Sequence, residues 1–404
     1  MTPAAAAGVP APPESDLAAA LFSDATFTAH LRSFLFDRVV SNGPDPGAWA
    51  VGGWLGYETG WIADVLRFGV VGYTSQPLWA PKDRNGTLLL HGDQEGYSVL
   101  GQAYAEFKYK DNLLTAYRHI VNQPEVNAQD NRMTPNTFEG VSLKGDFGTW
   151  GYYGGFLTAM KPRNAIDFVN IAGAAGVDQN EDMVLGTLSF SPMKDAKGRT
   201  SLYVVPNVLA SSYSDAVWKT GIGAETALRT SAQFMYQSSI GEGLLMGEGF
   251  EAWVAGIKGD LIYKSVTLTA GYTYAGEDAN WQSPYGTWPG FTNMQIKDFN
   301  RAEEQAVLLA ASLDVAAIGV RGLVVTASTA FDTHIADGLA EWTEYDFNAE
   351  YRLSWLEGDW EWLAPLALRG RYGYLISEQN GTSNQTTDLR LILNYEVQFK
   401  GSDI

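Results

Sequence analysis

The sequence contains no cysteine and little charge, and both absences restrict what the protein can be. Without cysteine in 404 residues, the chain forms neither a disulfide framework nor a thiolate metal site. Only 18% of the residues are charged, and 46 acids against 27 bases give a formal net charge of −19. Nucleic-acid phosphates call for a basic surface, so no nucleic-acid partner is expected. The acidity fits water-exposed acidic loops, or simple solubility.

Long apolar runs are also missing. No stretch reaches the roughly 18 apolar residues of a membrane-spanning helix, which excludes that type of span. Mean hydropathy is near zero, at −0.13, as expected where apolar and polar residues alternate. The chain is nevertheless rich in aromatic residues, with 13 Trp and 20 Tyr. Such rings gather at the membrane interfaces of transmembrane barrels.

Alternation is clearest in the last strand, residues 388–399, DLRLILNYEVQF. Its odd positions are all apolar and its even positions are polar, apart from Ile392. Successive side chains of a strand point to opposite faces, so one face can meet hydrocarbon and the other water. A transmembrane barrel strand needs this pattern over about 10 residues. A half-buried strand of a soluble sandwich has the same pattern.

The pattern recurs along the chain. Strands are predicted at 27–38, 48–61, 99–110, 201–210, 230–239, 250–263, 265–275, 304–314, 322–331, 343–355, 365–376 and 387–399. Short turns, such as 110–112 and 316–322, alternate with longer polar stretches at 74–96, 120–140, 161–182, 277–300 and 377–386. We therefore predict an all-β fold, a transmembrane antiparallel β-barrel of about 16 to 18 strands.

We expect one folded domain. It covers residues 25–399, between an Ala/Pro-rich flexible lead (1–24) and a short C-terminal extension (400–404). The lead lacks the basic and apolar regions of a secretory signal. If the protein is exported, its signal peptide is absent from this sequence. Met1 and the terminal KGSDI are then candidates for residues added to the natural chain.

No pattern indicates catalysis or a cofactor. The four histidines, among them His30 and His119, show no metal-ligand spacing and no obvious serine partner. The sequence contains no GxSxG, HExxH or P-loop motif. We expect no metal, no cofactor and no enzyme activity, and histidines that are ordinary wall or loop residues.

Arginines recur at positions of one parity on the first and last strands. These strands are neighbours in a closed barrel, so their arginines would line one wall of the lumen as a ladder. Guanidinium groups stay charged and bind carboxylates through two hydrogen bonds, so a row of them could pass an anion from site to site. Alternatively, each arginine pairs with an inward acid and only stabilises the wall. The candidates are Arg32, Arg38, Arg369, Arg371 and Arg390, with Arg352, Lys108 and Lys110 less certain in their facing.

The stretch 120–140 is the best candidate for a loop folded into the lumen. It is polar, contains two prolines, and carries Glu125, Asp130 and Arg132. Opposite the arginine wall, its acids would create a transverse field at a constriction. The alternative is an ordinary outer loop.

Several segments along the chain have a recognisable sequence: LRSFLFDR (31–38), QDNRMTPNTFEG (129–140), residues 293–325, LALRGRYGY (366–374) and the last strand. In sequence and in order, these segments resemble the OprD-like family of substrate-specific outer-membrane porins. The Thr-Pro-Asn at 134–136 and the five residues after Phe399 depart from the family pattern.

The resemblance implies an 18-stranded barrel with an inward constriction loop, in the bacterial outer membrane. It implies passive, selective uptake of small, often carboxylate-bearing solutes, with Asp130 and Arg132 at the constriction. The expected partners are lipid, lipopolysaccharide and small solutes, and the expected assembly is a monomer or loose trimer. Other possibilities are a non-selective porin, a barrel hydrolase, a plugged receptor and a soluble carbohydrate-binding β-protein.

Overall fold

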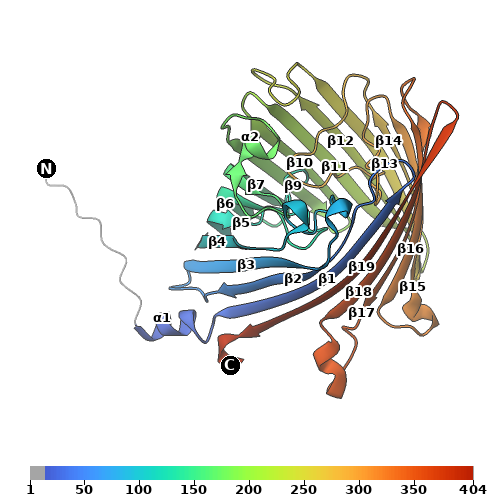
Figure 1. Ribbon diagram of the computed structural model, residues 1–404. Coiled ribbons are helices and arrows are strands. Elements are labelled where there is room, and N and C mark those ends of the chain that lie inside the picture. Colours follow the sequence, from blue (N-terminus) through green and yellow to red (C-terminus); the bar gives the residue numbers. More distant parts are fainter. Residues whose placement is uncertain (1–13, 404) are drawn as a thin grey trace.

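The protein folds as a closed antiparallel β-barrel (Figure 1). The structure is a computed structural model and describes residues 14–403. Its single sheet has 19 strands, of which β8 is only two residues long, so 18 strands form the wall. β1 pairs with both β2 and β19, and this second pairing closes the barrel. The predicted fold class is confirmed.

The elements occur in the following order. The strands are β1 (Thr26–Val40), β2 (Gly47–Glu58), β3 (Leu66–Trp79), β4 (Tyr97–Tyr109), β5 (Asn112–His119), β6 (Thr137–Asp146), β7 (Trp150–Lys161), β8 (Val169–Asn170), β9 (Met183–Met193), β10 (Ala196–Val205), β11 (Leu209–Gly221), β12 (Thr226–Ser238), β13 (Glu251–Tyr263), β14 (Val266–Ala275), β15 (Gln305–Asp314), β16 (Leu323–His334), β17 (Glu341–Arg352), β18 (Leu366–Gln379) and β19 (Thr382–Lys400). The α-helices are α1 (Glu14–Leu21) and α2 (Ile171–Ala174), and 3-10 turns are η1 (Lys82–Arg84), η2 (Gly92–Gln94), η3 (Val315–Ile318), η4 (Gly358–Leu363) and η5 (Gly401–Asp403). Among residues 14–403, no helix is long and apolar enough to cross a bilayer.

Connections differ in length between the two ends of the barrel. The helix α1 and the 3-10 turn η5 lie at one end of the barrel (Figure 1), where the turns include 110–111 and 264–265. The long connections 80–96, 120–136, 162–182 and 276–304 are at the opposite end. Outer-membrane barrels have short turns on the periplasmic side and long loops outside. The end with α1 and η5 therefore corresponds to the periplasmic end that the resemblance implies.

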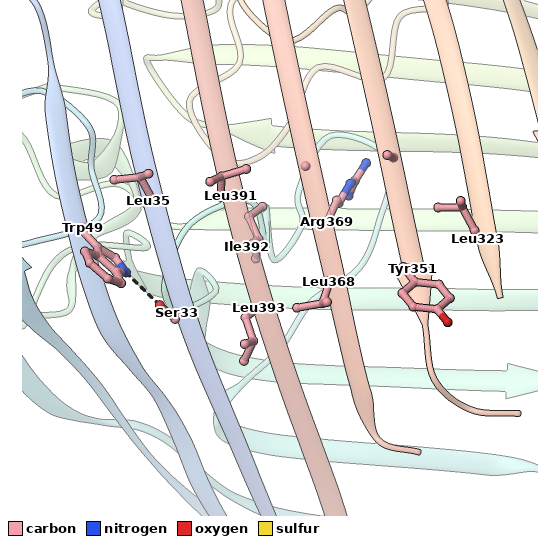
Figure 2. Close-up of a pocket in the computed structure, with 12 residues that line it drawn as sticks. Ser33, Leu35, Trp49, Leu323, Tyr351, Leu368, Arg369, Leu391, Ile392 and Leu393 are labelled. Carbon is pink, nitrogen blue, oxygen red and sulfur yellow. Dashed lines mark hydrogen bonds between the residues drawn. The ribbon is translucent and has the colours of Figure 1, made fainter. Parts of the chain in front are cut away.

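The strand faces follow the predicted alternation. On β19, Leu389, Leu391 and Leu393 are 37%, 48% and 37% exposed, while Asp388 and Arg390 are buried toward the interior. Figure 2 shows the outer surface of this region, where Leu391 and Leu393 lie beside Leu368 of β18. Apolar side chains thus form the outer surface, and polar ones form the lumen wall.

Some strands did not show in the sequence pattern. The structure adds β3, β5, β6, β7, β8, β9 and β11 to the predicted set. The predicted strand 201–210 is wrong in its bounds, because it covers the end of β10, the turn 206–208 and the start of β11. Register shifts between β3 and β4 at Val71/Gly72, and between β6 and β7 at Glu139/Gly140, explain part of this omission. A one-residue irregularity reverses the parity of every following side chain and breaks the apparent alternation.

The expected long loop at 377–386 is wrong. β18 and β19 extend through most of it and leave a turn at Asn380–Gly381. Both turn residues have left-handed φ angles, 51° and 75°, as a two-residue hairpin turn requires. Polar residues on both faces at the outer rim concealed the strand pattern.

Both ends of the domain are attached to the barrel. Part of the lead expected to be flexible forms α1, and the Tyr57 hydroxyl donates a 2.6 Å hydrogen bond to the Leu21 carbonyl. Residues 1–13 of that lead lie outside the described residues. In the C-terminal extension, Lys400 belongs to β19, and the Gly401 amide donates to the Ala25 carbonyl at 2.9 Å. Backbone hydrogen bonds thus join residues 23–25 to residues 401–402 at this end of the barrel.

Candidate functional site

The six predicted ladder arginines lie on four neighbouring strands at the barrel seam. They come from β1, β17, β18 and β19, and the strand register places Arg371 opposite Arg390, which in turn is opposite Phe36. Arg32 lies two levels nearer the periplasm, opposite Asn394. A cavity of about 390 Å³ opens along this wall, and four of the arginines line it: Arg32, Arg352, Arg369 and Arg371.

Asp388 accepts hydrogen bonds from two arginines at the outer end of this group. Arg38 donates to its Oδ2 at 2.5 Å through Nη2, and Arg390 donates to both oxygens at 2.8 and 2.9 Å. The Asp388 side chain is fully buried. One carboxylate thus faces two guanidinium groups, so the three side chains together keep a net positive charge.

Asp130 of the inward loop binds the arginine wall directly. Arg32 donates to its two oxygens at 2.6 and 3.1 Å, and also to the Arg132 carbonyl at 2.5 Å. The loop, residues 120–136, packs inside the barrel, where Val126 and Met133 are buried. Asp130 therefore neutralises one rung of the wall, instead of facing the wall across the lumen as expected.

Arg132 adds a guanidinium to the arginine wall. Its Nε donates to the Thr87 carbonyl at 2.7 Å, and its Cζ lies 5.3 Å from the Phe36 ring centroid. Arg38 and Arg390 lie over the same ring, at 5.3 and 4.8 Å. Phe36 is a shared platform for three cations, a role that the sequence pattern did not reveal.

A further arginine, Arg163, comes from the 162–182 connection and was not predicted. It donates to the Asn131 side chain. Burial lowers the pKa of Arg132 well below its ordinary value, and the nearby guanidiniums of Arg163 and Arg390 lower it further. Burial also lowers the pKa of Arg163 to about 10. Cations crowded in this way are stabilised by a bound anion.

The remaining ladder residues differ in how they are paired. Arg352 forms an ion pair with Glu350 at 2.5 Å, and Arg369 lies 3.9 Å from the same carboxylate. Within residues 14–403, Arg371, Arg132 and Arg163 form no ion pair. The Nε of Arg371 is buried and has no hydrogen-bond partner in this part of the chain.

Glu125 does not join the other predicted site residues. It is buried on the far wall, where the Ser211 hydroxyl of β11 donates to it at 2.6 Å. Burial raises the pKa of Glu125 to about 7. The contact with Ser211 anchors the start of the loop to the wall opposite the arginines.

A second loop, 276–304, also reaches the arginine wall, which the sequence analysis did not anticipate. Gln295 donates to the Asp388 side chain at 2.9 Å, and its carbonyl accepts from Arg390 at 2.9 Å. The amides of Ile296 and Lys297 donate to Glu344 of β17. The aromatic residues of this otherwise polar stretch were the available signal, because Trp281, Tyr285 and Trp288 are buried anchors.

One histidine does have a serine partner. His119 Nε2 lies 2.9 Å from the Ser142 hydroxyl, on adjacent strands β5 and β6. The Nδ1 atom lies 2.9 Å from the Tyr117 carbonyl. The two side chains belong to residues only 4% and 5% exposed, so the pair is part of the packed wall. The expectation that His119 lacks a partner is corrected.

Comparison with known proteins gives the family. The model of the OprD family of outer membrane porins matches residues 19–399. The chain belongs to the OprD family. It is thus a porin of the bacterial outer membrane, a selective channel for small solutes. A search of curated proteins gave no match.

Solved structures of OprD-type porins share its fold at low sequence identity. Pseudomonas aeruginosa OccK9 (OpdG) is 21% identical, with a TM-score of 0.83, over 94% of this chain and 100% of that one. P. aeruginosa OpdK with vanillate is 18% identical, with a TM-score of 0.80 and the same coverage. A BenF-like porin from Pseudomonas fluorescens Pf-5 is 17% identical, with a TM-score of 0.82 and again the same coverage.

Proposed function

We propose that this porin passes small carboxylate-bearing solutes by passive diffusion along the arginine wall. The observation that supports the proposal most is the excess of guanidinium groups at the seam. Arg371, Arg132 and Arg163 have no carboxylate partner in the described chain, and Arg38 and Arg390 share one. The relatives add support, because OpdK is described with vanillate, a carboxylate.

The wall suits transport better than tight binding. Arg371 and Arg390 share one level of the barrel, and Arg369 and Arg32 follow at successive alternate positions toward the periplasm. Adjacent levels are about 7 Å apart along a strand. A carboxylate can form two hydrogen bonds with one guanidinium before it leaves the previous one. Conduction needs several weak sites of this type.

Planar-bilayer recordings test the proposal. We expect the double substitution Arg369→Gln and Arg371→Gln to shift the reversal potential in a KCl gradient toward lower anion preference, and to weaken block by benzoate. Arg229→Gln is a matched control, because Arg229 pairs with Asp260 on β12 and β13, away from the seam. Unchanged reversal potential and benzoate block in the double variant contradict the ladder role.

Two other functions have specific observations behind them. The net charge of −19 would disfavour anions at the mouth and suits a non-selective porin. Equal permeation of neutral sugars and small acids of matched size would support that function. The Ser142–His119 pair suits a hydrolase in composition, but its burial denies access to a substrate. An esterase assay on the purified protein distinguishes this case.

We also propose that the apolar outer surface contacts lipid and the outer rim contacts lipopolysaccharide, with the barrel as a monomer or loose trimer. The exposed leucines of β19 support the lipid contact. Cross-linking in native outer membranes, followed by native gel electrophoresis, measures the assembly. A tight dimer would contradict the proposed state.

A further inference from the structure

His30 stands in the arginine wall, and neither the channel mechanism above nor the ladder uses it. It lies on the lumen face of β1, two residues from Arg32, and lines the same cavity as Arg32, Arg369 and Arg371. The residue is only 6% exposed. Its ring stacks on Trp54 of β2, with a centroid distance of 3.8 Å and an interplanar angle of 8°.

Both nitrogens of the His30 ring meet oxygen atoms of β19. Nδ1 lies 2.7 Å from Glu396 Oε2, and Nε2 lies 3.1 Å from Asn394 Oδ1. The amide orientation of Asn394 is fixed independently of the histidine. Arg32 Nε lies 2.7 Å from the same Oδ1 atom, and an arginine nitrogen only donates. The atom that faces His30 is therefore an oxygen and not the amide nitrogen.

Two acceptors require two donors. A neutral imidazole has one N–H and one bare nitrogen, so it can satisfy only one of these contacts. The imidazolium form satisfies both. A neutral pair, in which a protonated Glu396 donates to Nδ1, is the alternative. The Glu396 side chain is 45% exposed, so water solvates its carboxylate and favours ionised Glu396. The face of Trp54 further stabilises a cation stacked on it.

We infer that His30, as an imidazolium that balances Glu396, makes the anion preference of the arginine wall depend on pH. The inference rests on the proposed function of the wall. The charged and titratable neighbours are Arg32 on β1, Glu396 on β19, Asp130 and Arg132 on the inward loop, Arg369 and Arg371 on β18, and Glu350 and Arg352 on β17.

The direction of the effect follows from the charge of the pair. Below the titration of His30, the imidazolium balances Glu396, and the wall keeps its excess of arginine charge. Above it, His30 is neutral and Glu396 adds an uncompensated negative charge beside Arg32. Anion preference is therefore expected to fall as the pH rises.

Nitrogen NMR tests the protonation state without reference to transport. The chain contains four histidines, and the ring signals of ¹⁵N-histidine-labelled protein in lipid nanodiscs can be assigned by the loss of one set in His30→Gln. We expect both His30 nitrogens to show imidazolium shifts at pH 6, and one of them to move to the value of an unprotonated ring nitrogen as the pH rises. Neutral-imidazole shifts at pH 6 overturn the inference. This result does not depend on whether the arginine ladder carries solutes.

Bilayer recordings test the consequence for selectivity. We expect the reversal potential of the wild-type channel to shift toward lower anion preference between pH 5 and 8, and His30→Gln to lose most of this shift. His334→Gln is the matched control, because His334 is exposed at the outer end of β16. A full pH shift in His30→Gln contradicts the inference. Loss of anion preference in the Arg369/Arg371 double variant is a separate result and tests the ladder.

Discussion

Arg371 and Arg390 lie directly opposite each other on β18 and β19, although both carry a positive charge. Like charges at paired positions of an antiparallel sheet are destabilising. Arg390 has two hydrogen bonds to Asp388, whereas Arg371 has no ion pair in the described chain. The repulsion therefore acts on Arg371, which has no counter-charge. This is expected where a protein keeps a positive charge available for a ligand.

The two arginines should respond in opposite ways to neutralisation. We expect Arg371→Gln to leave the unfolding free energy unchanged or to raise it by roughly 0.5 kcal/mol, because it removes the repulsion. Arg390→Gln should lower it by about 1–3 kcal/mol, because it breaks the bonds to Asp388 and Gln295. Denaturant unfolding in liposomes, followed by Trp fluorescence, measures both. A larger loss of stability for Arg371→Gln than for Arg390→Gln would be against this assignment.

Neutralising Asp130 should change the selectivity of the channel in the direction opposite to neutralising an arginine of the wall. Asp130→Asn removes the only negative charge that Arg32 binds among the described residues, so the guanidinium becomes available to solutes. We expect a higher anion preference in a KCl gradient, together with noisier single-channel currents, because the loop loses its two-point attachment to β1. Asp64→Asn, at an exposed ion pair with Lys108 in a periplasmic turn, is the control. A lower anion preference in Asp130→Asn would contradict the assigned role.

Glu125 predicts a pH-dependent stability. Its folded-state pKa of about 7 is above the ordinary 4.5, so the folded state favours the protonated carboxyl. The resulting stabilisation is complete below about pH 4.5 and is lost as the pH rises through 7. One pKa unit corresponds to about 1.4 kcal/mol, so the loss is on the order of 3 kcal/mol.

Glu125→Gln should remove this dependence, because glutamine can still accept from Ser211 without a charge. We expect the variant to unfold at a higher temperature than the wild type at pH 8, and at a similar temperature at pH 4.5. Heat-modifiable gel migration after incubation at each pH gives the transition. Parallel curves for the two proteins across this range would exclude an effect of Glu125.

The sequence predicted the barrel and its seam better than its interior. The parity of Arg390 and Leu391 follows from the strand alone, because each residue must face either lipid or lumen. The placement of Asp130 against Arg32 does not, because the path of a loop depends on contacts between distant segments. Gln295 shows the same limit. Nothing in its local sequence indicates a bond to Asp388, which is 93 residues away. The His30–Glu396 contact needs the closure of β1 on β19.

Adjacent residues of β19 test the two faces of the seam. Leu391 is 48% exposed on the outer surface (Figure 2), and Ile392 lines the lumen cavity. We expect Leu391→Arg to destabilise the barrel by about 2–4 kcal/mol, because its charge enters hydrocarbon near the middle of the strand. Ile392→Arg should fold with a smaller loss, because its charge meets water, and it should raise anion preference beside Arg369, its partner on β18. Folding yield into liposomes and the reversal potential measure the two effects. Equal folding defects for both variants would mean that Ile392 does not face an aqueous lumen, and the arginine wall would then have no water-filled path beside it.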